Sequence, residues 1–186
     1  GCGGLVTREG ELQKREADWA DRLLGWGYGV LFVDSFNPRG YRSICSRKDR
    51  PITARDRARD VAAALRWLAS ETTIHDGRIA LLGWSHGAMT VLWSVDGSGP
   101  AQAIEPRTAI ALYPGCREVL RDADWRLGVP LTLLTGALDD WTPPAPCHEL
   151  AKRGGFTIKE FEGAYHGFDT PDSPVRIVKN IGSLKT

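Results

Sequence analysis

The sequence lacks a marked excess of charge of either sign. Its 24 lysines and arginines face 23 aspartates and glutamates, which gives a net charge of +1. This balance excludes a whole-molecule electrostatic attraction to nucleic acid or to an acidic membrane. A local basic stretch runs from Arg39 to Arg59, but aspartates interrupt it. We interpret the stretch as a solvated face, with a dedicated anion-binding patch as the alternative.

The sequence also lacks a long apolar run. No stretch reaches the ~18 residues of a membrane-spanning helix, and no leader with a basic start and a small-residue cleavage site opens the chain. We therefore expect a soluble protein, cytoplasmic or periplasmic, that does not bind membranes. Repeats and linker-like segments are missing too, and 186 residues suffice for one core. The sequence predicts a single domain over residues 1–186.

The four cysteines show neither Cys-x-x-Cys spacing nor a cysteine–histidine metal pattern. We therefore expect no zinc or other metal site. Cys116 follows an apolar run and Cys147 opens a helix-like pattern, so that adjacent strands could bring both to the same sheet edge. A Cys116–Cys147 disulfide is one hypothesis, and two buried free thiols are the alternative.

Apolar strand-like runs alternate with helix-like patterns along the chain. The run at residues 28–33 is apolar at nearly every position, which is typical of a strand buried on both faces. Repeated alternation predicts a three-layer α/β fold with a mainly parallel sheet, whose ligands bind at the carboxyl ends of the strands. Strands are predicted at 28–33 and 79–83 and near 108–113, 129–135 and 157–161. Helices are predicted at roughly 11–25, from Thr53, at 86–94, near 117–123 and 144–153, and from Pro174.

The segment Gly83-Trp84-Ser85-His86-Gly87 places a Gly-x-Ser-x-Gly pattern between a predicted strand and a predicted helix. This arrangement is typical of a nucleophile elbow, a strained turn that lifts the serine hydroxyl above the sheet edge. Glycines are expected on both sides because side chains there would collide with the adjoining strand and helix. A serine that only caps the helix is the alternative.

An acid and a histidine follow two later predicted strands. Asp139 comes just after the run at 129–135, and His166 comes just after the run at 157–161. The order Ser85, Asp139, His166 is the chain order of an α/β-hydrolase triad, in which an imidazole activates the serine and a carboxylate orients the imidazole. The alternatives are an acid that only stabilises a turn and an ordinary loop histidine.

The chain resembles the dienelactone hydrolase branch of the α/β-hydrolases from residue 1 to about residue 168. The resemblance implies Ser85 as nucleophile, Asp139 as orienting acid and His166 as base. The family places this acid three residues after a glycine and four before a proline, and Gly136 and Pro143 match that pattern for Asp139. The resemblance thus favours Asp139 over Asp140, which remains an alternative. The segments that carry the resemblance are Gly1-Cys2-Gly3-Gly4, Asp34-Ser35-Phe36-Asn37-Pro38-Arg39-Gly40, Gly83-Trp84-Ser85-His86-Gly87, Gly136-Ala137-Leu138-Asp139-Asp140-Trp141-Thr142-Pro143 and Gly163-Ala164-Tyr165-His166-Gly167-Phe168.

The opening segment resembles the loop that follows the family's third strand. The resemblance therefore implies an oxyanion hole made by the backbone amide of His86 and an amide near Cys2 or Gly3. It also implies an α/β-hydrolase fold that lacks the N-terminal strands. Either the sequence is incomplete, or the run at 28–33 and the strand before Ser85 pair directly in a reduced sheet of about five strands.

Several side chains near these groups are candidates for substrate binding. The aromatic candidates are Trp84, Trp141, Tyr165 and Phe36, with core packing as the alternative for Trp84. Arg39 approximates an arginine that binds the substrate carboxylate in dienelactone hydrolases, although those enzymes use a cysteine nucleophile.

The sequence thus predicts a cofactor-independent serine hydrolase that acts on a small-molecule ester or lactone through an acyl-enzyme. The alternatives are a peptidase or thioesterase with the same triad, and a catalytically silent α/β-hydrolase that serves as a binding protein. The oligomeric state and the compartment are not predicted.

Overall fold

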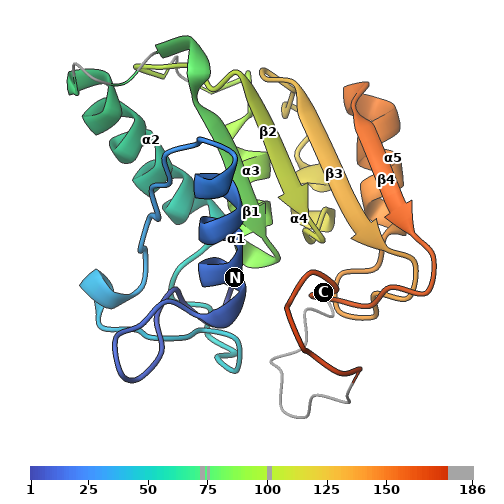
Figure 1. The fold of residues 1–186 in the computed structure, drawn as a ribbon. Coiled ribbons are helices and arrows are strands. Elements are labelled where there is room, and N and C mark those ends of the chain that lie inside the picture. The colour runs from blue at the N-terminus through green and yellow to red at the C-terminus, as the bar shows by residue number, and fades with distance from the viewer. Residues whose placement is uncertain (72–73, 75, 100–101, 176–186) are drawn as a thin grey trace.

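The computed structural model describes residues 1–71, 74, 76–99 and 102–175. Its centre is a parallel sheet whose four strands lie side by side in chain order (Figure 1). Parallel strands need long crossover connections, and these carry most of the helices. The strands are β1 (Ala80–Trp84), β2 (Thr108–Leu112), β3 (Leu131–Gly136) and β4 (Thr157–Phe161).

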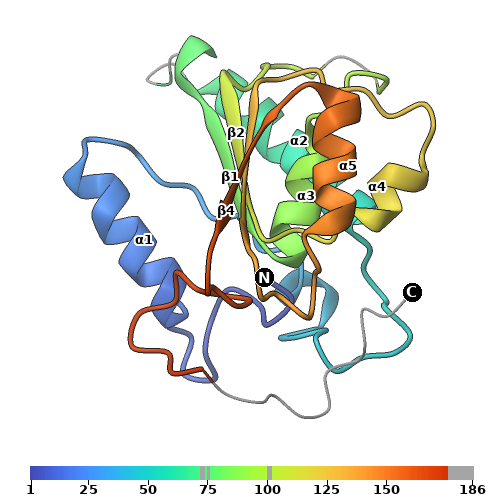
Figure 2. The same cartoon turned by 90° about the vertical axis from the view of Figure 1, so that its right-hand side faces the viewer.

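Helices cover both faces of this sheet, so the molecule has three layers (Figure 2). Helix α1 (Lys14–Gly25) lies on one face. The other face carries α2 (Ala54–Ser70), α3 (His86–Ser94), α4 (Arg117–Arg121) and α5 (Ala145–Gly154). The predicted three-layer, parallel α/β fold is confirmed, and the five helices lie close to the positions predicted for them.

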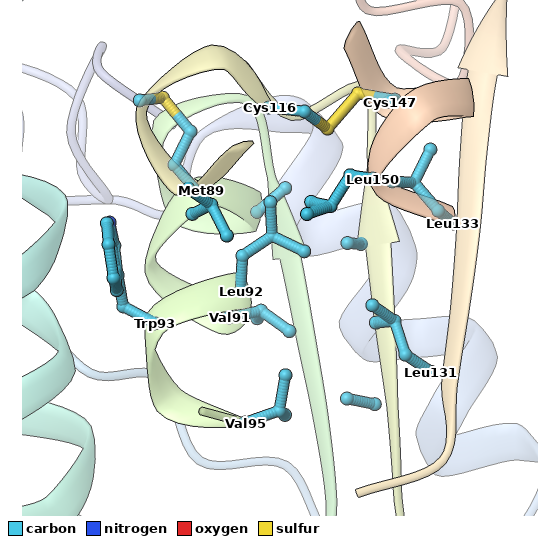
Figure 3. Packing of buried hydrophobic residues seen from close by; sticks show 14 of the residues in the cluster. Met89, Val91, Leu92, Trp93, Val95, Cys116, Leu131, Leu133, Cys147 and Leu150 are labelled. Carbon is cyan, nitrogen blue, oxygen red and sulfur yellow. A yellow bond between two sulfur atoms is a disulfide. The ribbon is translucent and has the colours of Figure 1, made fainter. Parts of the chain in front are cut away.

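Two apolar clusters hold the layers together. The larger one fills the space between the sheet and helices α3 and α5, with Leu92, Leu133 and Leu150 fully buried (Figure 3). The smaller one lies on the α1 face, where Trp84, Leu112 and Tyr113 are buried and Trp19 of α1 packs against them. Burial of these side chains fixes α1 over the carboxyl ends of β1 and β2.

The predicted strand at residues 28–33 is wrong. The segment has no regular structure, and β1 pairs with β2 on one side while no strand within the described ranges pairs with its other edge. Tyr28 and Leu31 are 58% and 48% exposed, whereas a strand buried on both faces would hide both. An apolar run becomes a strand only when a neighbour accepts its backbone hydrogen bonds, so the sheet has four strands rather than about five.

The predicted helix from Pro174 falls mainly on residues 176–186, which lie outside the described residues. Within the described part of the chain, the longest helices are too short or too polar to cross a lipid bilayer.

Both cysteine pairs are disulfides. Cys116–Cys147 joins the start of α4 to α5, which confirms the disulfide hypothesis (Figure 3). Cys2–Cys45 joins the opening segment to the loop before α2 and was not predicted. Both of its cysteines lie in irregular segments, where no periodic pattern indicates which parts of the chain meet.

Candidate active site

Ser85 occupies the turn between β1 and α3. Its φ of 53° and ψ of −119° are costly for a residue with a side chain. The Ser85 amide donates to the Leu112 carbonyl at 2.9 Å, and the Ser85 carbonyl accepts from the Met89 amide at 2.9 Å. Strand β2 and helix α3 therefore hold the strained turn from both sides.

The two glycines of this turn are not equivalent. A methyl group at Gly83 would lie 2.4 Å from the Gly87 carbonyl oxygen, so that position requires glycine. A methyl group at Gly87 would have the Arg57 guanidinium, at 3.7 Å, as its nearest neighbour, which is an ordinary contact. The expected collision is thus found at Gly83, and the expectation for Gly87 is wrong.

The structure brings Ser85, His166 and Asp139 together at the carboxyl ends of β1, β4 and β3. Ser85 Oγ lies 2.9 Å from His166 Nε2. His166 Nδ1 lies 2.8 Å from Asp139 Oδ2 on the other side of the ring. Thr142 Oγ1 also lies 3.1 Å from Nδ1. Both imidazole nitrogens are therefore hydrogen-bonded, and the side chains of Ser85, His166 and Asp139 form a continuous relay.

Asp139 is 3% exposed, and both oxygens of its carboxylate accept hydrogen bonds. Its Oδ1 accepts from the amides of Trp141 and Thr142, each at 2.9 Å, and its Oδ2 accepts from the Thr142 hydroxyl at 2.8 Å. Burial alone would raise the pKa of Asp139, but the hydrogen bond and charge of His166 and the hydrogen bonds of Thr142 outweigh it and lower this pKa. Asp139 is therefore ionised at neutral pH, while Asp140 is exposed to solvent.

The loops that carry the acid and the histidine are joined directly. The Leu138 amide donates to the Ala164 carbonyl at 2.9 Å, and the Ala137 amide donates to the Phe161 carbonyl at 3.0 Å. A methyl group at Gly136 would lie 2.4 Å from the Ala164 oxygen, so glycine permits this approach. The distance between Asp139 and His166 is thus set by backbone contacts as well as by their own hydrogen bond.

Aromatic rings enclose the imidazole of His166. The Tyr113 ring meets it edge-on with centroids 4.6 Å apart, and the Trp141 ring lies 4.8 Å away. Trp141 is half-buried beside the relay, where a pocket residue is expected. Tyr165, also predicted to bind substrate, is 41% exposed next to His166 in the chain.

The remaining predicted substrate residues are engaged elsewhere. Trp84 is 6% exposed in the α1-face cluster, as the core-packing alternative predicts. Phe36 is 2% exposed, with its ring 6.3 Å from that of His86. Arg39 donates twice to Asp60 of α2, at 2.8 Å each, which leaves its guanidinium occupied by an ion pair.

The proposed oxyanion donors come from two segments. His86 is the first residue of α3, where backbone amides have no acceptor within the helix. The opening segment lies against this turn, because a methyl group on Gly87 would be 3.9 Å from the Gly1 nitrogen. Cys2 is held there by its disulfide and by the Ile44 amide, which donates to the Cys2 carbonyl at 2.9 Å, and Gly3 is exposed.

A contact between Arg57 and His86 was not predicted. Arg57 Nη1 lies 2.9 Å from His86 Nδ1, and the guanidinium lies over the Phe36 ring at 4.8 Å. Burial lowers the pKa of Arg57 to about 10, and burial together with Arg57 lowers the pKa of His86 to about 3. Because arginine only donates, His86 accepts at Nδ1 and carries its proton at Nε2. Arg57 belongs to the basic stretch that was interpreted as solvated, and for this residue that interpretation is wrong.

Within the described residues, no group of three or more histidine, cysteine, aspartate or glutamate side chains is arranged to hold a metal ion.

Comparisons with known proteins give a match only in the solved structures. No family model and no curated protein matches the chain. The carboxylesterase Cest-2923 from Lactobacillus plantarum matches with a TM-score of 0.56 and 16% identity, over 84% of this chain and 68% of that one. An alpha-beta serine hydrolase homologue from Coxiella burnetii matches with a TM-score of 0.56 and 17% identity, over 83% and 69%. A puromycin hydrolase matches with a TM-score of 0.53 and 23% identity, over 69% of this chain.

The chain has an α/β-hydrolase fold. It spans only 24% of the puromycin hydrolase and 59% of Thermogutta terrifontis esterase 2, which also matches. Identities this low show the fold alone, so the dienelactone hydrolase resemblance stays a prediction.

Proposed function

We propose that the protein is a serine hydrolase that cleaves small carboxylic esters or lactones through an acyl-enzyme. The observation that most supports this function is the relay of 2.9 Å from Ser85 Oγ to His166 Nε2 and 2.8 Å from His166 Nδ1 to Asp139 Oδ2. A serine hydroxyl is a weak nucleophile at neutral pH, and this arrangement is how a neighbouring base activates it.

The reaction proceeds in two halves. His166 Nε2 takes the Ser85 proton as Oγ attacks the ester carbonyl, and the protonated ring then gives that proton to the leaving alcohol. His166 next takes a proton from the water that attacks the acyl-enzyme, and it returns this proton to Ser85 Oγ as the acid leaves. Asp139 keeps the proton on Nδ1 between these steps and stabilises the charged ring.

Each half of the reaction passes through a tetrahedral intermediate, and the negatively charged oxygen of this intermediate needs hydrogen-bond donors. We assign these to the His86 amide and to an amide of the opening segment near Cys2 or Gly3. The start of α3 favours a negative charge because the unpaired amides and the helix dipole both point toward it. Loss of one such donor typically lowers turnover by roughly 10² to 10³.

A peptidase or thioesterase with the same three residues is the second candidate, favoured by the match to a puromycin hydrolase. A silent binding protein is less well supported. The strained backbone of Ser85 lowers the stability of the fold, and binding alone does not require this strain.

Pre-steady-state kinetics with p-nitrophenyl acetate tests the proposal. We expect wild-type protein to release p-nitrophenol in a burst close to the enzyme concentration, and Ser85→Ala to show neither burst nor turnover. Parallel assays with a thioester and an aminoacyl anilide rank the three substrate classes by kcat/KM. A correctly folded wild type that hydrolyses none of them would support the silent alternative.

A further inference from the structure

The segment that carries His166 has little regular structure of its own. Residues 162–170, which follow β4, form turns rather than a helix or strand. Gly163 and Gly167 on either side of His166 have φ of 71° and 75°. Contacts with the rest of the molecule must therefore hold this histidine at its distance from Ser85.

Asp169, three residues beyond His166, makes these contacts with three different parts of the fold. Its Oδ1 accepts from the Tyr113 hydroxyl at 2.6 Å. Its Oδ2 accepts from the indole nitrogen of Trp84 at 2.8 Å and from that of Trp19 at 2.7 Å. One carboxylate thus joins the His166 segment to the ends of β1 and β2 and to α1.

The bonding pattern requires a carboxylate. An indole N–H can only donate, so both tryptophans need an acceptor. The Tyr113 hydroxyl accepts from Arg15 Nη1 at 3.2 Å and is left with its own proton to donate. Burial, together with Asp169, raises the pKa of Tyr113, so this proton stays in place. The two oxygens of Asp169 accept from all three donors, whereas an amide would turn its own N–H groups toward at least one of them.

These hydrogen bonds control both ends of the contact between Ser85 and His166. Trp84 immediately precedes Ser85, and the Tyr113 ring contacts the His166 ring with centroids 4.6 Å apart. Phe168, next to Asp169, packs against Tyr113 with centroids 5.5 Å apart. The carboxylate therefore fixes the nucleophile turn and the histidine segment relative to each other.

We propose that Asp169 is a positioning residue that holds His166 in line with Ser85. This inference rests on the proposed function. Among the hydrogen bonds of the described residues, Asp169 bonds to neither Ser85 nor His166, and it acts through the position of His166. A displacement of about 1 Å in a reacting group lowers catalysis on the order of 10²-fold, so a looser His166 segment has a large effect on turnover.

Asp169→Asn tests the proposal, with Asp172→Asn as its matched control. Asp172 lies three residues further along, is exposed, and bonds only to Lys14 of α1, at 2.5 Å, among the contacts of the described residues. We expect Asp169→Asn to lower kcat by roughly 10- to 100-fold with KM nearly unchanged, because substrate binding is not altered. Asp172→Asn is expected to keep both constants.

Trp19→Phe keeps the test decisive if Asp169→Asn does not fold. Trp19 lies on α1 and donates one of the three hydrogen bonds, so its loss is expected to lower kcat by about 3- to 10-fold. Unchanged kcat in a folded Trp19→Phe together with an unfolded Asp169→Asn would overturn the positioning role, since the carboxylate would then serve stability alone.

A double-mutant cycle separates positioning from stability. If Asp169 acts through His166, Asp169→Asn has no further effect on the residual activity of His166→Ala. An undiminished effect in that background, or wild-type kcat in Asp169→Asn, would overturn the proposal.

The low-field proton resonance of the His166 Nδ1–H gives a readout that does not need activity. We expect a sharp signal in the wild type and in Asp172→Asn, and a broadened one in Asp169→Asn as the hydrogen bond to Asp139 becomes mobile. An inert wild type with this pattern would reject the proposed function and keep the positioning role. An unchanged signal in Asp169→Asn would reject the positioning role whatever the activity.

Discussion

At the scale of single residues, two neighbouring aspartates have different surroundings. Asp139 is buried and bonded to His166, whereas Asp140 is exposed. The resemblance to dienelactone hydrolases favoured Asp139, through the family's spacing from Gly136 and Pro143, but left Asp140 open. The structure gives the contact to Asp139, because the turn that follows β3 directs the Asp139 carboxylate inward to the Trp141 and Thr142 amides.

Asp139→Asn and Asp140→Asn form a matched pair that tests this assignment. We expect Asp139→Asn to lower kcat by about 10⁴, because an amide no longer fixes the tautomer of His166. Asp140→Asn should keep kcat within a factor of two or so, as expected of an exposed side chain. Steady-state hydrolysis of p-nitrophenyl acetate measures both, and a larger loss in Asp140→Asn would contradict the assignment.

His86 makes stability depend on pH in a defined window. Burial and Arg57 lower the pKa of His86 to about 3 in the folded protein, while an unfolded chain binds this proton near pH 6.5. Between these values the unfolded state holds more protons, so the free energy of unfolding falls as the pH falls, by at most about 1.4 kcal/mol per pH unit from this group.

His86→Gln removes that proton uptake. Urea unfolding between pH 7 and pH 4 should show a shallower loss of stability in the variant than in the wild type. Parallel curves for the two proteins would mean that His86 is protonated in the folded state after all.

The sequence could predict Ser85, Asp139 and His166 because each follows an apolar run, and the ends of parallel strands meet at one edge of the sheet. It could not predict Arg57 or Asp169 as partners of the site. The contact of Arg57 with His86 depends on which face of α2 packs against α3. The contacts of Asp169 depend on how the segment after β4 folds back against α1. Neither is encoded in a local pattern.

At the scale of elements, the turn between β1 and α3 depends on a close backbone approach at one of its two glycines. Gly83 faces the Gly87 carbonyl, while Gly87 has room for a methyl group. The Gly-x-Ser-x-Gly pattern alone treats the two as equal.

Gly83→Ala and Gly87→Ala should therefore differ. We expect Gly83→Ala to lower the free energy of unfolding by about 1–3 kcal/mol or more, since the added carbon meets backbone that cannot rotate away. Gly87→Ala should retain near-native stability and activity. Urea denaturation measures the first effect, and equal stabilities would show that the turn can relax.

Residues 28–33 show where element prediction fails. Their apolar pattern is that of a strand, but a strand also needs a hydrogen-bonding neighbour, which depends on distant parts of the chain. The strands β1 to β4 were predicted correctly because each finds such a neighbour in the next apolar run.

At the scale of the whole molecule, the two disulfides tie together different regions. Cys116–Cys147 is buried and closes a separation of 31 residues between α4 and α5. Cys2–Cys45 is half-buried, closes a separation of 43 residues, and holds the opening segment beside the turn between β1 and α3.

Removal of each disulfide should therefore have a different effect. Replacing Cys116 and Cys147 by alanine is expected to lower the free energy of unfolding by about 2–4 kcal/mol with kcat retained. Replacing Cys2 and Cys45 should lower kcat as well, because the segment that we propose as the source of an oxyanion donor loses its covalent link. Urea unfolding and p-nitrophenyl acetate hydrolysis on both double variants distinguish the two, and equal kcat in both would argue against an oxyanion donor in the opening segment.

We infer that His166 makes Ser85 a nucleophile. Covalent labelling by a fluorophosphonate, located by mass spectrometry, tests it most directly. We expect one adduct, on the peptide that contains Ser85, in the wild type, and labelling slowed at least about 10³-fold in folded His166→Ala. A folded wild type that stays unlabelled, or a Ser85 adduct that forms equally fast in His166→Ala, would contradict the claim.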